Sequence, residues 1–433
     1  MLKSVFDMRK VILSGVMIVC AWLAGDVGHA AEACVEVTRA NLVRCVLAAS
    51  LDVRSNQAAA EAIRGRQDAV SAWLPSNPVV SVSGARRDGP AAQDTVTNWY
   101  VSLAQELQIA GQQALRGEAV GHEVRAQQQR NLAVQRDIVA AAWRVYFEAL
   151  AAEEGLALAR KLETIQTQTA QVARARVDEG LNAQVDADLA EAAAAKATQI
   201  RLEAERARHL ATGVLHVLFG RNPLVGKLTI TGSMTPLMVA DKLARKAAFG
   251  SAAKQPEVLA WAEEQRAFEA HAASQRRARV PNPTLSLFLQ EDGFNEQVMG
   301  IGLSLPVTLP HPIGRSYKGE ADEALARSRQ SELQAQKAQQ AIRLELAAAL
   351  TEYQIRQRQV ATQSAANVRR AGQTLSSLAE QIRMGRIPPR EALILQRGLT
   401  EYLLNDVSNR LAVALASVRL ARAAGLPLEK GLQ

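Results

Sequence analysis

Histidines, cysteines and helix-end carboxylates are the side chains of this sequence that could do chemistry. Its six histidines are scattered, and His209 and His216, on one expected helix, are seven residues apart. That spacing puts them near the same helix face, but a structural zinc site needs about four ligands, so we expect no metal site. No phosphate-binding glycine loop, hydrolase elbow or His-Glu-x-x-His sequence occurs. The sequence therefore predicts neither an enzyme nor a bound cofactor.

The sequence contains three cysteines, Cys20, Cys34 and Cys45. Cys20 belongs to residues 1–30, which have the charged start, short apolar run and small-residue end of a secretory signal peptide. If the chain is exported, its mature part keeps Cys34 and Cys45. We therefore predict a disulfide between them, because disulfides persist in the oxidising environment outside the cytosol. Lipidation of Cys34 and two free thiols are the alternatives, and Glu32 gives Cys34 a poor context for lipidation.

Asp186 and Glu391 are carboxylates at matched positions. Each lies six residues after a glycine, Gly180 or Gly385, and near the expected start of a helix. Glycine adopts at little cost the positive φ that a helix C-terminus often requires, so a tight turn is expected at both places. A carboxylate after such a turn is favoured by the unpaired N–H groups of the next helix. Helix capping is the simplest role for both.

Length and composition favour a helical protein that does not bind nucleic acid. The chain has 433 residues, a net charge of +8 and only 4% aromatic residues. Alanine is abundant, which suits closely packed helices. Acidic and basic residues are mixed, with no basic run that has interleaved aromatics, so we expect no nucleic-acid partner. After residue 30, no apolar stretch approaches the ~20 residues of a membrane-spanning helix.

The elements that would position these residues appear twice. Asn77-Pro78 and Asn282-Pro283 each follow a helical pattern and precede an alternating one, and they are 205 residues apart. The same offset relates Gly180 to Gly385, and an offset of 202 relates Arg116–Ala119 to Lys318–Ala321. A nearly constant offset over so long a stretch predicts an internal duplication.

The expected organisation follows from this duplication. Long proline-free helices with coiled-coil spacing are predicted at about 112–178 and 318–383, and shorter ones at about 41–73, 186–219, 255–279 and 389–424. The predicted parts are a signal peptide, 1–30; a first repeat, 31–219, with a β-hairpin at about 78–108 and a tip turn at about 180–186; an inter-repeat equatorial segment, 220–250; a second repeat, 251–424, with a β-hairpin at about 284–307 and a tip turn at about 385–391; and a tail, 425–433.

Both hairpins have strands with one apolar face and one small or polar face. In the second hairpin the apolar side chains include Leu285, Leu287, Ile301 and Leu303, and Phe288 interrupts the polar face. Membrane β-strands need about 9–11 residues per crossing, so these four side chains are predicted to face lipid. Four strands cannot close a barrel, because the smallest barrels use about eight. Either the strands form a small soluble sheet, or several chains contribute four each.

With this plan, the chain resembles the TolC-like outer-membrane efflux proteins, the exit ducts of Gram-negative tripartite pumps. The resemblance depends on the duplicated helix–strand–strand–helix–helix order, the Asn-Pro entries to the strands and the turn Gly180–Asp186. It implies a mainly α fold with a small β part: a homotrimer whose twelve strands close an outer-membrane β-barrel, continued by a periplasmic α-helical barrel. The implied partners are a periplasmic adaptor (membrane fusion protein), a proton-driven inner-membrane pump of the resistance-nodulation-division type, and outer-membrane lipid.

The resemblance also implies roles for the turns. The two turns would form the periplasmic tip that docks the adaptor, through Gly180, Leu181, Asp186, Gly385, Arg386 and Arg390. Glu391 would narrow the closed pore, paired with Arg386 or Arg390. Leu107–Gln113 resembles the ducts of cobalt–zinc–cadmium and nickel pumps, so heavy-metal cations are the expected cargo, and drugs or other small organic compounds are the alternative. The rival class is a periplasmic helical adaptor or scaffold, which would need a lipoyl-like β-domain.

Overall fold

The computed structural model describes residues 34–88, 95–223, 228–237, 252–291, 296–307, 309, 312–314, 316–426 and 428. The predicted signal peptide, the two hairpin connections, much of the inter-repeat segment and most of the tail lie outside these residues. The chain divides into two compact units. We call Met1–Val53, Gln135–Phe249 and Leu344–Gln433 the core unit, and Arg54–Val134 and Gly250–Arg343 the sheet unit.

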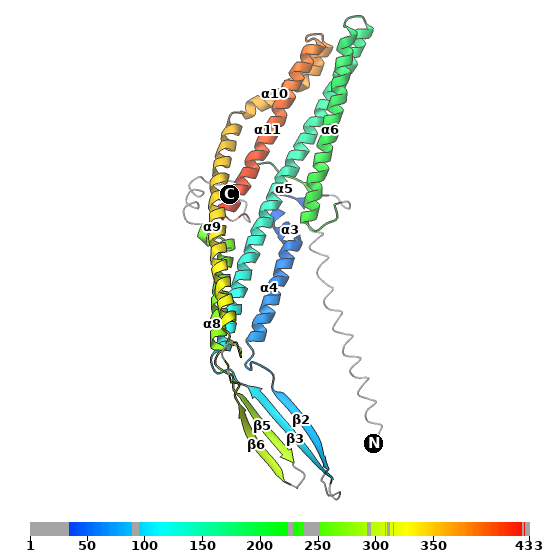
Figure 1. The fold of residues 1–433 in the computed structure, drawn as a ribbon. Helices are drawn as coiled ribbons and strands as arrows, with labels where there is room; N and C mark the ends of the chain where they lie inside the picture. The colour runs from blue at the N-terminus through cyan, green and yellow to red at the C-terminus, as the bar shows by residue number, and fades with distance from the viewer. Residues whose placement is uncertain are drawn as a thin grey trace, which may run out of the picture. The chain divides into compact units, whose positions relative to one another are not determined.

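The described elements follow the predicted order of helices and strands closely (Figure 1). The helices are α3 (Leu42–Ala49), α4 (Leu51–Val70), α5 (Gln112–Asp178), α6 (Gln184–Leu218), α8 (Pro256–Arg277), α9 (Lys318–Ala361), α10 (Ala365–Arg383) and α11 (Pro389–Ala423), with a short 3₁₀ turn η2 (Ala252–Lys254). The strands are β1 (Glu36–Val37), β2 (Val79–Asp88), β3 (Thr95–Glu106), β4 (Thr229–Ile230), β5 (Thr284–Glu291) and β6 (Gln297–Ser304). Within the described residues, the helices include none with the length and apolar character needed to cross a bilayer.

Two predicted helices are each interrupted once. The helix expected at 41–73 is broken at Ser50, whose backbone is extended with ψ of 125°. The helix expected at 318–383 is broken at Thr362–Ser364, and the Ser364 hydroxyl accepts a hydrogen bond from the Asn367 N–H at 3.1 Å to cap α10. The predictions of continuous helices were wrong because apolar spacing continues across both breaks. Serine, which favours N-cap positions, was the available signal.

Asn282, of the Asn-Pro pair before the second hairpin, lies at a hydrogen-bonded junction in the sheet unit. The Asn282 side chain donates to Glu106 Oε1 at 2.6 Å, at the end of β3, and accepts from Gln112 Nε2 at 2.9 Å, at the start of α5. The prolines on either side of it prevent α8 from continuing, because proline lacks an N–H and crowds the preceding turn. One asparagine between two prolines therefore joins the end of β3 to the start of α5.

The strands of the sheet unit form one four-stranded antiparallel sheet in the order β2-β3-β5-β6 (Figure 1). The two hairpins meet through β3 and β5, where Leu103 pairs with Leu287. Each hairpin therefore provides one edge strand, β2 or β6, so both outer edges of this sheet are open to pairing.

The core unit is built around three aromatic side chains of α5. Trp143, Tyr146 and Phe147 are fully buried, with ring centroids 5.6–5.8 Å apart. Trp143 Nε1 donates to the Leu428 carbonyl at 3.2 Å, and the Tyr146 hydroxyl donates to the Thr231 carbonyl at 2.8 Å. These bonds attach two later parts of the chain, at Thr231 and Leu428, to the apolar cluster around these rings, which also includes parts of α3 and α11.

Four helix ends share one hydrogen-bond geometry. At α5 and α10 the N–H of the residue after a positive-φ glycine, Gly180 or Gly385, bonds back to a carbonyl five residues earlier (Leu181 to Arg176, 2.8 Å; Arg386 to Gln381, 2.9 Å). The ends of α6 and α11 repeat it at Gly220 and Gly425. This Schellman motif satisfies the last carbonyls of a helix. The glycine pairs 180/385 and 220/425 are both separated by the sequence offset of 205.

Cys34 and Cys45 form a disulfide in the core unit, with their Cα atoms 6.1 Å apart. The bridge joins the residues before β1 to α3, and both cysteines are buried. We predict that alkylation and mass spectrometry of the mature protein will find no free thiol, and that Cys45→Ser will cost about 2–4 kcal/mol of stability. A lipid mass on Cys34, or two alkylated cysteines, would contradict the prediction.

Candidate functional site

One face of the sheet is apolar across all four strands. The pairing register aligns Leu285 with Leu303 and Leu287 with Ile301, and paired residues point to the same side of a sheet. The four residues predicted to face lipid therefore lie together, and Ile301 is 74% exposed. The apolar residues of this side, which we call the apolar face, are Val80, Val82, Trp99, Val101, Leu103, Leu285, Leu287, Leu289, Met299, Ile301 and Leu303. Sequence analysis did not include Val80 and Val82, although they alternate with serines.

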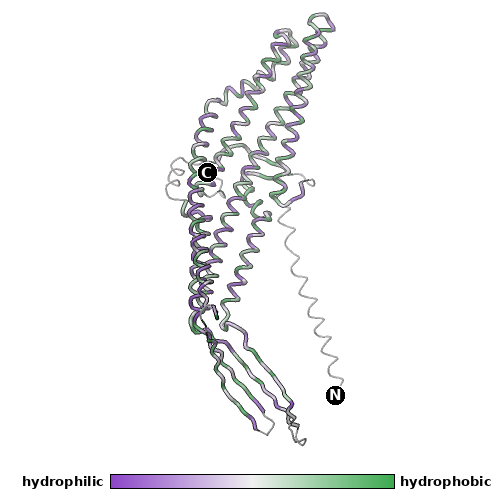
Figure 2. Tube along the Cα trace, viewed as in Figure 1, coloured by the Kyte–Doolittle hydropathy of each residue, from purple (hydrophilic) through white to green (hydrophobic). Residues whose placement is uncertain are grey.

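The opposite side of the sheet carries mainly small, polar and aromatic residues, and its described charged side chain is Glu106 at the end of β3. Figure 2 shows hydrophilic and hydrophobic residues alternating along the strands. We define the neutral face as Ser81, Ser83, Asn98, Tyr100, Ser102, Ala104, Ser286, Phe288, Gln290, Gly300, Gly302 and Ser304. Phe288, which interrupts the polar pattern in the sequence, stacks on Tyr100 with ring centroids 5.8 Å apart.

The predicted tip residues lie at two exposed turns of the core unit. Gly180 and Gly385 have φ of +72° and +70°, as expected for the two turns. Leu181 is 65% exposed, and Arg386, Arg390 and Glu391 are exposed as well. Asp186 lies in the first turn of α6 and Glu391 in the first turn of α11, and Asp186 Oδ2 accepts from Asn182 Nδ2 at 3.4 Å.

A residue that sequence analysis missed links the two turns. Arg176, in the last turn of α5, donates from its guanidinium to the Ile382 carbonyl at 3.3 Å, at the C-terminal end of α10. A Cβ at Gly385 would lie 3.5 Å from the same guanidinium. A cation beside a helix C-terminus stabilises the partial negative charge there. The only sign of this contact in the sequence was that Arg176 is a basic residue in the last turn of an expected helix.

Behind the turns, α5, α6 and α11 of the core unit border a groove of about 800 Å³. We call it the tip groove; its lining includes Leu189, Leu393 and Ile394, and the cations Lys196, Arg390 and Arg397. Gln166 Oε1 and Thr400 Oγ1, from two further lining residues, are buried and lack a hydrogen-bond partner within the described residues. The groove therefore offers apolar contact, positive charge and free acceptors.

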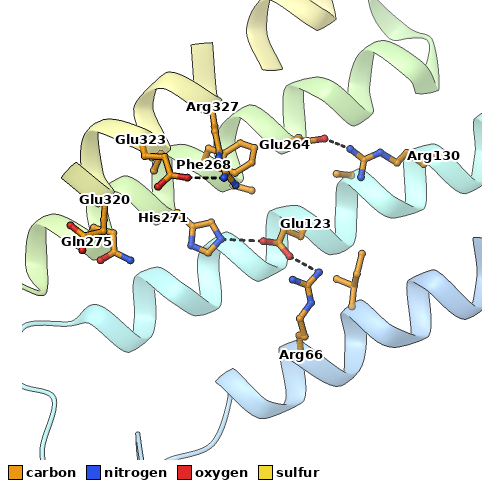
Figure 3. A pocket seen from close by; sticks show the side chains of 14 residues that line it. Arg66, Glu123, Arg130, Glu264, Phe268, His271, Gln275, Glu320, Glu323 and Arg327 are labelled. Carbon is orange, nitrogen blue, oxygen red and sulfur yellow. Dashed lines mark hydrogen bonds and ion pairs between the residues drawn. The ribbon is translucent and has the colours of Figure 1, made fainter. Parts of the chain in front are cut away.

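A charged pocket of about 520 Å³ lies between helices of the sheet unit (Figure 3). Glu123 on α5 is held between His271 Nε2 on α8, at 3.1 Å, and the Arg66 guanidinium on α4, at 2.9 Å. The hydrogen bond from His271 and the charge of Arg66 hold the pKa of Glu123 below its ordinary value, although desolvation opposes them. The pairing of His271 with Glu123 could not be predicted from the sequence, because the two residues are 148 positions apart.

Metal binding finds no support in the part of the chain that the structure describes. No three histidine, cysteine, aspartate or glutamate side chains there are close enough to share an ion. His216 is buried, and burial lowers its pKa, whereas His209 is exposed. The pocket of Figure 3 is a network of ion pairs, in which Arg130 bonds to Glu264 and Arg327 to Glu323.

Acid should weaken the helix contacts around Glu123. A carboxylate with a lowered folded-state pKa stabilises the fold above its ordinary pKa of 4.5, and this contribution is lost as the pH falls through the lowered value. We predict that the melting temperature of the wild type falls more steeply below about pH 5 than that of Glu123→Gln. Glu61→Gln, at an exposed position of α4, is the matched control. Equal acid profiles for the wild type and Glu123→Gln would contradict the prediction.

Solved structures described as an outer-membrane channel, an outer-membrane protein and a channel-forming protein share this fold. The MtrE channel of Neisseria gonorrhoeae in its open state matches with a TM-score of 0.74 and 18% identity, over 91% of this chain and 90% of that one. VceC, an outer-membrane protein of Vibrio cholerae, matches with a TM-score of 0.72 and 16% identity, over 90% and 96%. CusC, whose structures were described in connection with folding and transmembrane channel formation, matches with a TM-score of 0.74 and 16% identity, over 90% of this chain and 92% of that one. No protein-family model matches the chain, and no curated protein matches its sequence.

Proposed function

We propose that the protein is a passive exit duct in a Gram-negative outer membrane, the channel component of a tripartite efflux pump. The observation that carries the proposal is the two-sided sheet: a continuous apolar face, largely exposed, with the small, polar and aromatic residues of the neutral face behind it. Membrane β-strands need lipid-compatible side chains on one side and polar ones on the other. The shared fold of described outer-membrane channels supports the same conclusion.

The working form in this proposal is a homotrimer. Each chain provides a four-stranded sheet with two open edges, and three such sheets joined edge to edge give a twelve-stranded barrel without edges. Helix faces of the core unit support association with further copies, because Leu210 and Val214 of α6 and Leu344 of α9 are 47–73% exposed. Exposed leucines and valines on one face of a long helix mark an interaction surface.

The proposed partners are a periplasmic adaptor and a proton-driven pump of the resistance-nodulation-division type. The two exposed turns and the tip groove are the proposed docking surface, because apolar side chains, cations and free acceptors occur together there. Glu391 is the proposed pore constriction, with Arg386 or Arg390 as its partner. Three like charges around one axis repel, so such a ring needs neighbouring cations.

Heavy-metal cations are the proposed cargo, on the strength of the Leu107–Gln113 resemblance. Drugs or other small organic compounds are the second candidate, and the neutral face favours them. The residues of the neutral face include no carboxylate or imidazole, the groups that metal ions prefer. Glu106, at the β3 end of the same side, already accepts a hydrogen bond from Asn282. In this proposal metal ions therefore pass the neutral face without being bound by its residues.

Single-channel recording tests the proposed function. Purified protein in planar bilayers should give stable conductance steps, and chemical cross-linking of the same sample should give trimers. Glu391→Ala should fold normally but raise the conductance or change the cation preference. Glu332→Ala, at an exposed position of α9, is the control. Absence of conductance would refute the duct, whereas unchanged conductance with lowered thermal stability would show that Glu391 only stabilises the first turn of α11, whose N-cap is Pro388.

A further inference from the structure

Tyr100 and Phe288 form a rigid aromatic surface on the neutral face. Their rings stack with an interplanar angle of 26°. The Phe288 ring covers Gly300, its register partner on β6, so closely that a Cβ there would lie 2.3 Å from Phe288 Cζ. Glycine at position 300 is therefore what allows the ring to lie against the sheet. We call these two rings the aromatic platform.

The surroundings of the platform are polar but uncharged. Gln290 pairs with Tyr100 and Ser102 pairs with Phe288, so an amide and a hydroxyl border the rings. A metal ion finds no charged ligand among these side chains. An organic cation finds two π faces, which attract positive charge, and a flat one can also stack on them.

We infer that the aromatic platform is a contact site for flat aromatic organic cations in transit. This inference rests on the proposed function, which makes the neutral face the lumen of the duct. The platform covers parts of three strands, β3, β5 and β6, so three chains would place three platforms around one lumen. Flat cations would be retained briefly there, and potassium or a non-aromatic cation would pass without stacking.

Blockade of single channels by ethidium, a flat aromatic cation, tests the inference. Ethidium should reduce the potassium current of the wild type, and its half-blocking concentration should rise about fivefold in Tyr100→Ser, as loss of one stacked cation contact implies. Phe288→Leu, which keeps an apolar side chain over Gly300, should also weaken the block. Tetraethylammonium carries the same charge without a ring, so it can make a cation–π contact but cannot stack, and its half-blocking concentration should change less than that of ethidium in both variants.

Trp99→Leu is the matched control. Trp99 precedes Tyr100 on β3 and therefore points to the other side of the sheet. Its replacement should leave the ethidium block unchanged. Conducting channels with the same ethidium block in the wild type, Tyr100→Ser and Phe288→Leu would overturn the contact site and leave the duct intact. Absence of conductance in the wild type would overturn the proposed function and the contact site together.

Discussion

Replacing Trp143 with alanine should lower the free energy of unfolding by about 3–5 kcal/mol, the largest effect expected for a single core substitution. The side chain is fully buried against Tyr146 and Phe147, and the surrounding helices cannot collapse into the space it would leave. Its Nε1 hydrogen bond to the Leu428 carbonyl would also be lost. Thermal and urea denaturation of the detergent-solubilised protein, followed by circular dichroism, measures the change.

Trp73→Ala is the control for this prediction. Trp73 is 90% exposed, between α4 and β2, so its loss should change the stability in detergent by no more than about 0.5 kcal/mol. Equal losses for the two substitutions would show that the aromatic cluster of α5 is not the core of this unit.

Val82→Arg should cost about 2–4 kcal/mol on insertion, because it places a charge near the middle of the side that we propose to face lipid. Val82 is 73% exposed on the apolar face and pairs with Val101. Desolvation of the guanidinium is expensive there, since hydrocarbon offers no compensating partner. Folding into lipid vesicles at increasing urea concentrations measures the cost, and the amount recovered in outer membranes gives the effect in cells.

Ser81→Arg provides the matched comparison. Ser81 is the preceding residue of the same strand, is also exposed, and belongs to the neutral face. The same side chain there should allow insertion and change only the ion preference of the pore. Equal insertion of both variants would mean that the faces are assigned the wrong way round or that neither meets lipid.

The sequence was sufficient to predict most of the fold because its signals were local. Pairs of prolines predicted where helices end, and alternation of apolar and polar residues predicted the strands. Gly180 and Gly385 predicted two turns, which the structure shows as Schellman motifs. The helix breaks at Ser50 and Ser364 escaped prediction, since their neighbours keep helical apolar spacing.

The candidate sites were less predictable, because their contacts join distant parts of the chain. The register that aligns Leu287 with Leu103 and Ile301 depends on how two hairpins meet, which no single strand encodes. Likewise, Arg176 contacts Ile382 across 206 residues. The residues around Arg176 in the sequence do not distinguish it from a solvent-exposed arginine, so this contact could not be predicted.

Modification of single cysteines in the sheet tests the central claim most directly. The structure holds Cys34 and Cys45 in a disulfide, so a cysteine introduced at position 81 or 82 would be the reactive thiol of the mature chain. A charged, membrane-impermeant thiosulfonate should modify Ser81→Cys in bilayers and reduce its single-channel conductance. It should leave Val82→Cys unmodified and fully conducting. Equal modification of both residues, or a wild-type protein that conducts no ions, would contradict a lipid-embedded duct lined by the neutral face.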